Sequence, residues 1–145
     1  ILLLTSLLLA CNAGNEKKTG VAEPAAENHA EHAEHATELA LNNGVKWKAD
    51  STTLVNVALL QKIISNAKKG SLEIYFQTAT DLQNGLNKMI SECKMKGVDH
   101  EALHHWPEPL MEKTNELKKT NSIETAGNIS VEIEKQINLF PQYFE

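Results

Sequence analysis

The sequence has few cysteines, no basic patch, and no long apolar segment after its first ten residues. Cys11 and Cys93 are its only cysteines, and the formal net charge is -5 with neutral histidines. Without a basic patch, nucleic-acid binding is not expected. No later stretch approaches the roughly 20 apolar residues that a membrane-spanning helix requires. The chain also lacks a CxxC pair and the CxxCH motif that attaches haem covalently.

The first ten residues, ILLLTSLLLA, form an apolar run that ends at Cys11. The run is too short for a stable transmembrane helix and fits the apolar core of a secretory signal peptide. Because neither Met nor a basic leader precedes it, we expect the sequence to start inside that signal. Leu8-Leu9-Ala10-Cys11 resembles the bacterial lipoprotein cleavage box, which implies removal of residues 1–10 and lipidation of Cys11. The alternative is a generic signal peptide followed by a cysteine by chance.

A lipidated Cys11 places the mature protein in the cell envelope, held to a membrane by acyl chains rather than by a spanning helix. Cys93 is then the only remaining thiol and cannot form an intramolecular disulfide. We interpret Cys93 as a metal ligand, a reactive group or an intermolecular partner. The alternative is a structural cysteine that packs as a small apolar side chain.

Residues 11–41 are predicted to form a tether, because they are rich in Ala, Glu, His and Asn and have few large apolar side chains. Such a composition cannot bury a core, and a helix over its second half is marginal alone. His29, His32 and His35 recur every three residues and suit weak binding of zinc, copper or nickel. The alternative is a solvated tether in which these histidines are merely polar.

Residues 42–145 are long enough for one domain with one core. Apolar residues recur there at helical spacing, and no strand is expected. The predicted helices run from about Ser51 to Lys69, from Ser71 to about Lys96, from Asp99 through Leu117, and from Asn121 or Ser122 to Pro141. Short connections between such helices predict an all-α, antiparallel up-down-up-down four-helix bundle.

Two details of this bundle depend on individual residues. Pro107 and Pro109 interrupt the third segment, so we expect a kink there, or a short turn followed by a restart at Pro107. Trp47 is expected to pack across the bundle end. The alternative is that its ring binds a ligand.

The predicted apolar face of the first helix comprises Leu54, Val57, Ala58, Leu60, Ile64 and Ala67.

The segment CKMKGVDHEALHHW, residues 93–106, places a thiol, a thioether and three imidazoles around a glycine. Cys93 lies four residues after Met89, and His100 and His104 are also four apart, so each pair shares one helix face. A short turn through Gly97 should bring the two faces together. The predicted metal ligands are Cys93, Met95, His100 and His104, with Met89 and Met111 as additional candidates.

These residue types favour a soft or borderline metal over Mg²⁺ or Ca²⁺. A thiolate and two imidazoles can hold Cu(I) with three ligands, and a thioether can serve as a fourth. The same groups can hold Zn²⁺ tetrahedrally. His105 points about 100° away from His104 on a helix and is the weakest candidate. The alternative is a hairpin stabilised by packing and local hydrogen bonds alone.

The pattern C-x-M-x-G-x-x-H-x-x-L-H-x-W, with Asn43-Gly44-x-Lys46-Trp47 upstream and a His-rich tail behind a lipoprotein box, resembles a group of small bacterial lipoproteins. The resemblance covers most of the mature chain and implies a heavy-metal- or copper-associated periplasmic helical domain. In that group an apolar residue follows the tryptophan. Here Pro107 follows it, so the shape of the third helix is not carried over.

Together these features predict a lipid-anchored envelope protein that binds copper as Cu(I), or zinc, for buffering, scavenging or chaperoning. An alternative of another class is a membrane-anchored helical module that binds another envelope protein and has no metal role. A haem-binding bundle with Met and His axial ligands is a third. We expect no enzymatic activity, because no Ser-His-Asp signature, nucleotide-binding loop or supported pair of catalytic carboxylates is present.

Overall fold

The computed structural model describes residues 39–145, which contain helices and no extended strand. The prediction of an all-helical domain is therefore confirmed. The predicted signal peptide, Cys11 and the three tail histidines lie outside the described residues. The helices are α1 (Ser51–Ser65), α2 (Leu72–Glu92), α3 (Val98–His104), α4 (Pro107–Lys119) and α5 (Ile123–Tyr143).

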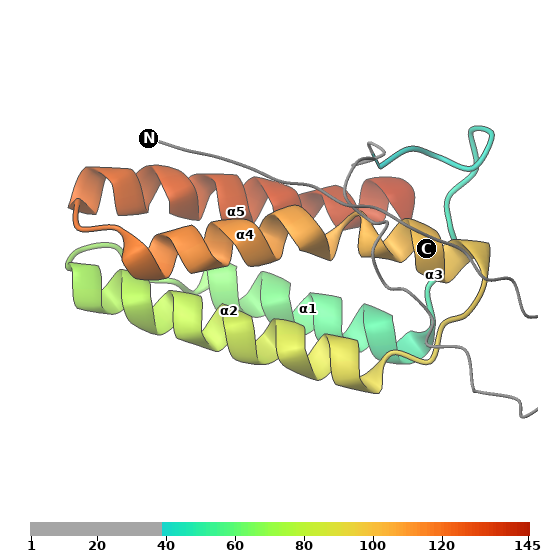
Figure 1. Ribbon diagram of the computed structural model, residues 1–145, viewed down its shortest axis with the longest axis horizontal. Helices are drawn as coiled ribbons and strands as arrows, with labels where there is room; N and C mark the ends of the chain where they lie inside the picture. Colours follow the sequence, from blue (N-terminus) through green and yellow to red (C-terminus); the bar gives the residue numbers. More distant parts are fainter. Residues whose placement is uncertain (1–38) are drawn as a thin grey trace, which may run out of the picture. The chain divides into compact units, whose positions relative to one another are not determined.

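The four longer helices lie side by side, and the short α3 is set at one end of them (Figure 1). Helix α1 contacts α2 and α5, and α4 contacts the same two helices. The α1–α2 and α4–α5 connections lie at the opposite end from α3 (Figure 1). The segment that carries the candidate metal ligands therefore occupies one end of the helical domain.

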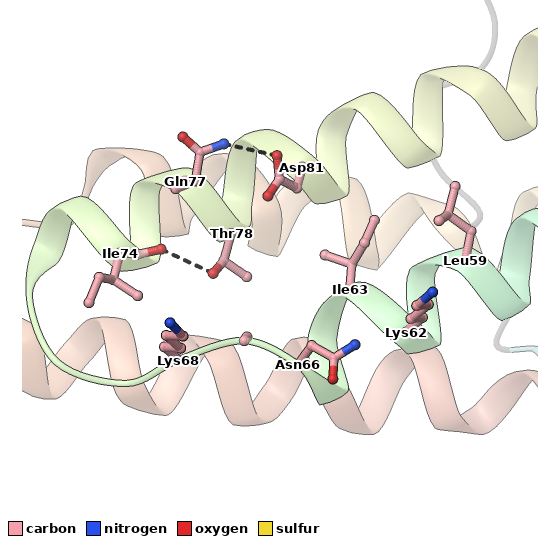
Figure 2. A pocket seen from close by; sticks show the side chains of 10 residues that line it. Leu59, Lys62, Ile63, Asn66, Lys68, Ile74, Gln77, Thr78 and Asp81 are labelled. Carbon is pink, nitrogen blue, oxygen red and sulfur yellow. Dashed lines mark hydrogen bonds between the residues drawn. The ribbon is translucent and has the colours of Figure 1, made fainter.

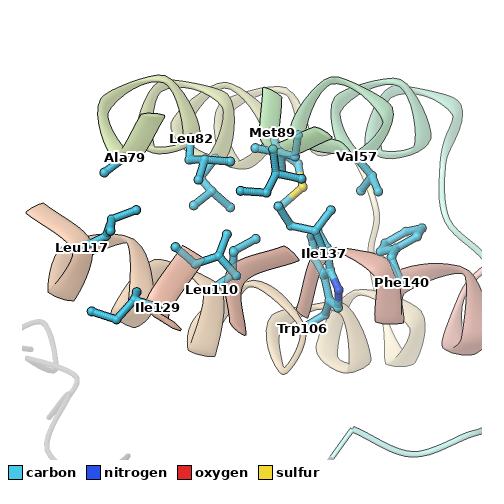
Figure 3. Packing of buried hydrophobic residues seen from close by; sticks show 14 of the residues in the cluster. Val57, Ala79, Leu82, Met89, Trp106, Leu110, Leu117, Ile129, Ile137 and Phe140 are labelled. Atoms are coloured by element: carbon cyan, nitrogen blue, oxygen red, sulfur yellow. The ribbon is translucent and has the colours of Figure 1, made fainter. Parts of the chain in front are cut away.

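The core is formed by the apolar faces of the four longer helices (Figure 3). Leu60, Leu82, Leu110 and Ile133 are fully buried, one from each of these helices. Trp106, between α3 and α4, is also fully buried. Its indole nitrogen donates to the carbonyl of Gln136 at 2.9 Å, so burying this polar atom costs no hydrogen bond.

The first turn of α1 presents a different face from the one predicted. Leu54 is 41% exposed and Ala58 is also exposed, whereas Thr53 and Asn56 are buried. The Asn56 amide donates to Glu92 at 3.0 Å, and its carbonyl accepts from Lys88 at 3.1 Å. These partners satisfy the hydrogen-bonding groups of the buried amide. Polar side chains of α1 can therefore face the core at positions that the spacing of apolar residues did not predict to be buried.

Several predicted helix ends are wrong. Helix α1 ends at Ser65 rather than Lys69, and α2 ends at Glu92 rather than Lys96, because Cys93 adopts extended backbone angles. Pro141 lies inside α5 instead of stopping it, and the Phe144 amide still donates to the Phe140 carbonyl at 2.9 Å. A proline removes one amide donor, and near a helix end the neighbouring hydrogen bonds suffice to continue the helix.

The prolines of the third segment separate two helices. Helix α3 ends at His104 and α4 starts at Pro107. Of the two shapes expected for this segment, the structure has the short turn with a restart at Pro107, and not the kinked helix. At the first position of a helix the missing amide of proline has no intrahelical partner to lose. Asp99, from which the third helix was predicted to run, lies in the first turn of α3, and the N-cap is Gly97.

Residues 47–49 pair with the C-terminal end of the chain. The Trp47 amide donates to the Tyr143 carbonyl at 2.8 Å, and the Glu145 amide donates to the Trp47 carbonyl at 3.0 Å. The Trp47 ring is partly buried against the core, as expected, and its indole nitrogen donates to Ala40. This pairing attaches the segment before α1 to the end of α5.

Replacing Gly85 with alanine is expected to separate α1 from α2. A Cβ atom at Gly85 would lie 2.7 Å from Cδ2 of the fully buried Leu60, whereas one at Gly127 meets only the Tyr75 hydroxyl at 3.4 Å. Overpacking costs about 1–3 kcal/mol, and alanine gains about 1 kcal/mol over glycine in a helix. In urea unfolding, Gly85→Ala should be about 1–3 kcal/mol less stable than the matched Gly127→Ala, because the gain in helix propensity is common to both variants. Equal stabilities would contradict this packing.

Candidate metal centre

The turn between α2 and α3 depends on Gly97. Its φ of 68° and ψ of -155° lie in a region that only glycine adopts without strain. The Gly97 carbonyl accepts from the amides of His100 and Glu101, both at 3.0 Å, and so starts α3. The extended backbone of Cys93 and this sharp turn direct the first turn of α3 back toward the end of α2.

Two aspartates attach this turn to the segment that precedes α1. Asp50 caps α1 by accepting from the Thr53 amide at 2.6 Å, and its other oxygen accepts from the Lys94 amide at 3.0 Å. Asp99 accepts from the Lys48 amide at 3.0 Å. The backbone on both sides of the candidate ligands is therefore fixed by charge-assisted hydrogen bonds.

These hydrogen bonds also set the charge state of Asp50. Partial burial raises the pKa of its carboxyl. The hydrogen bonds from Thr53 and Lys94, with the positive charge of Lys94, outweigh burial, so the pKa lies below its ordinary value. The carboxylate is therefore ionised at neutral pH, where it accepts both hydrogen bonds.

Three predicted ligands lie close together. Cys93 Sγ is 3.6 Å from His100 Nδ1, and His100 Nε2 is 2.9 Å from His104 Nε2. The two imidazole rings are nearly perpendicular, with centroids 4.5 Å apart. His100 thus lies between the thiol and the second imidazole, and it presents a different ring nitrogen to each.

The predicted thioethers occupy different surroundings. Met95 Sδ lies 3.6 Å from the hydroxyl oxygen of Thr53, which is also 4.0 Å from Cys93 Sγ. The two sulfur atoms therefore flank one buried hydroxyl. Met89 is nearly fully buried in the core, and Met111 is partly buried against it.

A small cavity of about 50 Å³ adjoins the thiol and the imidazole pair. This volume exceeds that of one water-sized probe, so the cavity can hold a single ion or water. Most of its wall is apolar. Its lining comprises Met89, Ile90, Cys93, His100, Leu103, His104 and Pro107.

Met111 does not line this cavity, and neither does His105. His105 borders another hollow, together with Trp47, Val98 and Glu101. Within residues 39–145, no group of three or more His, Cys, Asp or Glu side chains is arranged to hold one metal ion. The contacts among the candidate ligands are therefore pairwise: one sulfur–nitrogen pair and one nitrogen–nitrogen pair.

Sequence reasoning missed a familiar pattern in this segment. His100-Glu101-Ala102-Leu103-His104 reads H-E-x-x-H, in which two imidazoles one helical turn apart bind zinc and the glutamate acts as a general base. Glu101 borders the same hollow as His105, whereas the two histidines of the pattern line the cavity beside Cys93. The geometry therefore retains the metal-binding pair of the pattern and separates it from the glutamate.

A larger hollow of about 510 Å³ lies between α1 and α2, away from these residues (Figure 2). Its lining contains no histidine, cysteine or methionine. Two of its polar side chains are already paired, since Thr78 donates to the Ile74 carbonyl and Gln77 donates to Asp81. This hollow offers no ligand set comparable to that of the smaller cavity.

No protein-family model, curated protein sequence or solved structure matches this chain. In the part of the chain that the structure describes, no helix has the length and apolar character to cross a membrane. Any function therefore has to be inferred from the chemistry of the site.

Replacing Asp50 with asparagine is expected to destabilise the domain at neutral pH and not in acid. Asparagine keeps one carbonyl oxygen for two amide donors, which costs about 1 kcal/mol. Because the folded-state pKa is lowered, this contribution is complete above the unfolded-state pKa of about 4 and is lost as pH falls through the folded-state value.

Urea unfolding of Asp50→Asn and the wild-type protein at pH 7 and near pH 3 measures this difference. The matched control is Asp81→Asn, whose carboxylate accepts only from Gln77 on the exposed face of α2. The control should differ from wild type by less than about 0.5 kcal/mol at either pH. A destabilisation by Asp50→Asn that is the same at both pH values would contradict the role assigned to its charge.

Proposed function

We propose that this protein binds Cu(I) through Cys93 and His100 and acts as a copper buffer, scavenger or chaperone of the cell envelope. The observation that carries the proposal is the 3.6 Å separation of Cys93 Sγ from His100 Nδ1. With metal–sulfur and metal–nitrogen bonds of about 2.3 and 2.0 Å, two ligands 110–120° apart are about 3.5–3.8 Å from each other. One ion fits between these two atoms without a large movement of either side chain.

The surroundings of this pair favour a soft, singly charged ion. A thiolate and Cu(I) together carry no net charge. The desolvation free energy of placing this neutral pair beside an apolar wall is therefore lower than that of placing a divalent ion there. The Met89 thioether lines the cavity together with Cys93, and the Met95 thioether lies near the same Thr53 hydroxyl as the Cys93 sulfur. Sulfur ligands of this kind select Cu(I) over Mg²⁺ and Ca²⁺.

The remaining predictions complete the proposal. Lipidation of Cys11 would hold the protein on a membrane, and His29, His32 and His35 would collect metal for the helical domain. The long helices form the antiparallel up-down-up-down bundle in this proposal, which their short connections and neighbour contacts support. The resemblance to small copper-associated lipoproteins points in the same direction.

A membrane-anchored interaction module is the competing explanation. The same 3.6 Å and 2.9 Å contacts are then only hydrogen bonds, and Cys93 only fills space beside the core. A single chemical difference separates the two explanations. Metal binding requires the sulfur as a ligand, whereas packing requires only its volume.

An anaerobic Cu(I) titration against a competing chelator tests the proposal on the whole chain. The background carries Cys11→Ser, His29→Asn, His32→Asn and His35→Asn, so that only the helical domain can bind tightly. We expect one equivalent, with an affinity on the order of 100-fold weaker after Cys93→Ser, because loss of a direct ligand costs at least as much as loss of its supporting contacts.

Met111→Leu is the matched control, since Met111 lies outside the cavity, and it should leave the affinity unchanged. Circular dichroism of each variant establishes that the fold is retained. Equal, weak Cu(I) binding by the background protein and its Cys93→Ser variant would remove the copper proposal and favour the interaction module.

A further inference from the structure

We propose that His100 is shared by two competing metal half-sites, one for Cu(I) and one for a tetragonal divalent cation such as Ni²⁺ or Cu²⁺. The inner half-site is Cys93 Sγ with His100 Nδ1, and it rests on the function proposed above. The outer half-site is His100 Nε2 with His104 Nε2. Occupation of either half-site disfavours occupation of the other, because both use the same imidazole.

The first support is the direction of the two contacts. Cys93 faces Nδ1 and His104 faces Nε2 of the same ring. The two nitrogens of an imidazole point away from each other and cannot bind one ion together. A single ion among Cys93, His100 and His104 therefore requires a rearranged ring, in agreement with the finding that no three-ligand group exists within residues 39–145.

The second support is the separation of the imidazole nitrogens. The Nε2 atoms of His100 and His104 are 2.9 Å apart. Two nitrogens about 2.0 Å from a metal and about 90° apart lie about 2.8–2.9 Å from each other, which is the geometry of tetragonal ions such as Ni²⁺ and Cu²⁺. The pair spans one helical turn of α3, and the H-E-x-x-H pattern uses the same spacing for a divalent ion.

Charge and exposure assign the ions to the half-sites. His104 is exposed, so a doubly charged ion bound there keeps water in its remaining coordination positions. Cys93 and His100 are partly buried beside a mainly apolar cavity, where a neutral thiolate–Cu(I) pair is tolerated better. The same imidazole thus joins a sulfur-containing inner position to a nitrogen-only outer position.

The proton on neutral His100 accounts for the competition. A metal at Nδ1 leaves the proton on Nε2, where it can be donated to His104, and a metal at Nε2 leaves it on Nδ1, facing the Cys93 sulfur. In each state the nitrogen without metal is hydrogen-bonded, which orients the ring for the bound ion. Filling both half-sites would remove this last proton from the ring.

The test compares Cu(I) and Ni²⁺ in the background that lacks Cys11 and the tail histidines. Ni²⁺ is the divalent probe because it does not oxidise the thiol. We expect His104→Gln to abolish Ni²⁺ binding and to change Cu(I) affinity less than threefold. Cys93→Ser should weaken Cu(I) binding about 100-fold and change Ni²⁺ affinity less than about threefold, and His100→Gln should weaken the binding of both ions. Calorimetry with protein preloaded with one equivalent of Cu(I) should show Ni²⁺ affinity lowered at least tenfold.

Nitrogen-15 NMR of the unmutated imidazoles provides a readout that needs no variant. With Cu(I) bound, the proton of His100 should reside on Nε2. Cu(I) binding that depends equally on Cys93 and His104 would overturn the shared-ring proposal and leave the copper function intact. Undiminished Ni²⁺ binding to the Cu(I)-loaded protein would overturn the competition. Absence of Cys93-dependent Cu(I) binding would overturn the copper function itself.

Discussion

The carboxylate of Asp50 makes the contact on which the geometry of the candidate site depends. One of its oxygens caps α1 and the other holds the amide of Lys94, the residue after Cys93. The start of one helix and the end of another are thereby fixed by one charged group. Because Asp99 holds the Lys48 amide in the same way, the turn between α2 and α3 has anchors on both sides. Side chains on so short a turn need such anchors to keep a constant separation.

The inward face of α1 links this constraint to the core. Thr53 has a polar side chain and is nevertheless fully buried. Its polar groups are satisfied there, because its amide donates to Asp50 and its hydroxyl lies against the sulfurs of Cys93 and Met95. A leucine at the same position would fill the space between α1 and α2 but would offer no polar contact to either sulfur. The core near the candidate site is therefore polar at a defined point, while Leu60 and Leu82 keep it apolar farther along the helices.

Helical periodicity predicts much of this arrangement from local information. Spacing by four placed Cys93 on one helix face with Met89, and His100 on one face with His104. The observed N-caps, Asp50 and Ser122, are of residue types that favour this position. The rotation of the α1 face and the second role of Asp50 could not be predicted in this way. Both depend on hydrogen bonds between residues far apart in the sequence, and such contacts exist only after the helices have packed. The H-E-x-x-H pattern, by contrast, can be read directly from residues 100–104.

The position of the His100 ring determines what chemistry the turn can support. A ring whose one nitrogen faced both Cys93 and His104 would define a single three-ligand site, and a ring turned to solvent would define none. The observed ring contacts sulfur on one edge and nitrogen on the other, so in the proposed half-sites its protonation pattern would report which edge holds a metal ion. In the two half-sites that we propose, this single ring would discriminate between metal ions by their charge and softness, because one edge faces sulfur and the other faces nitrogen.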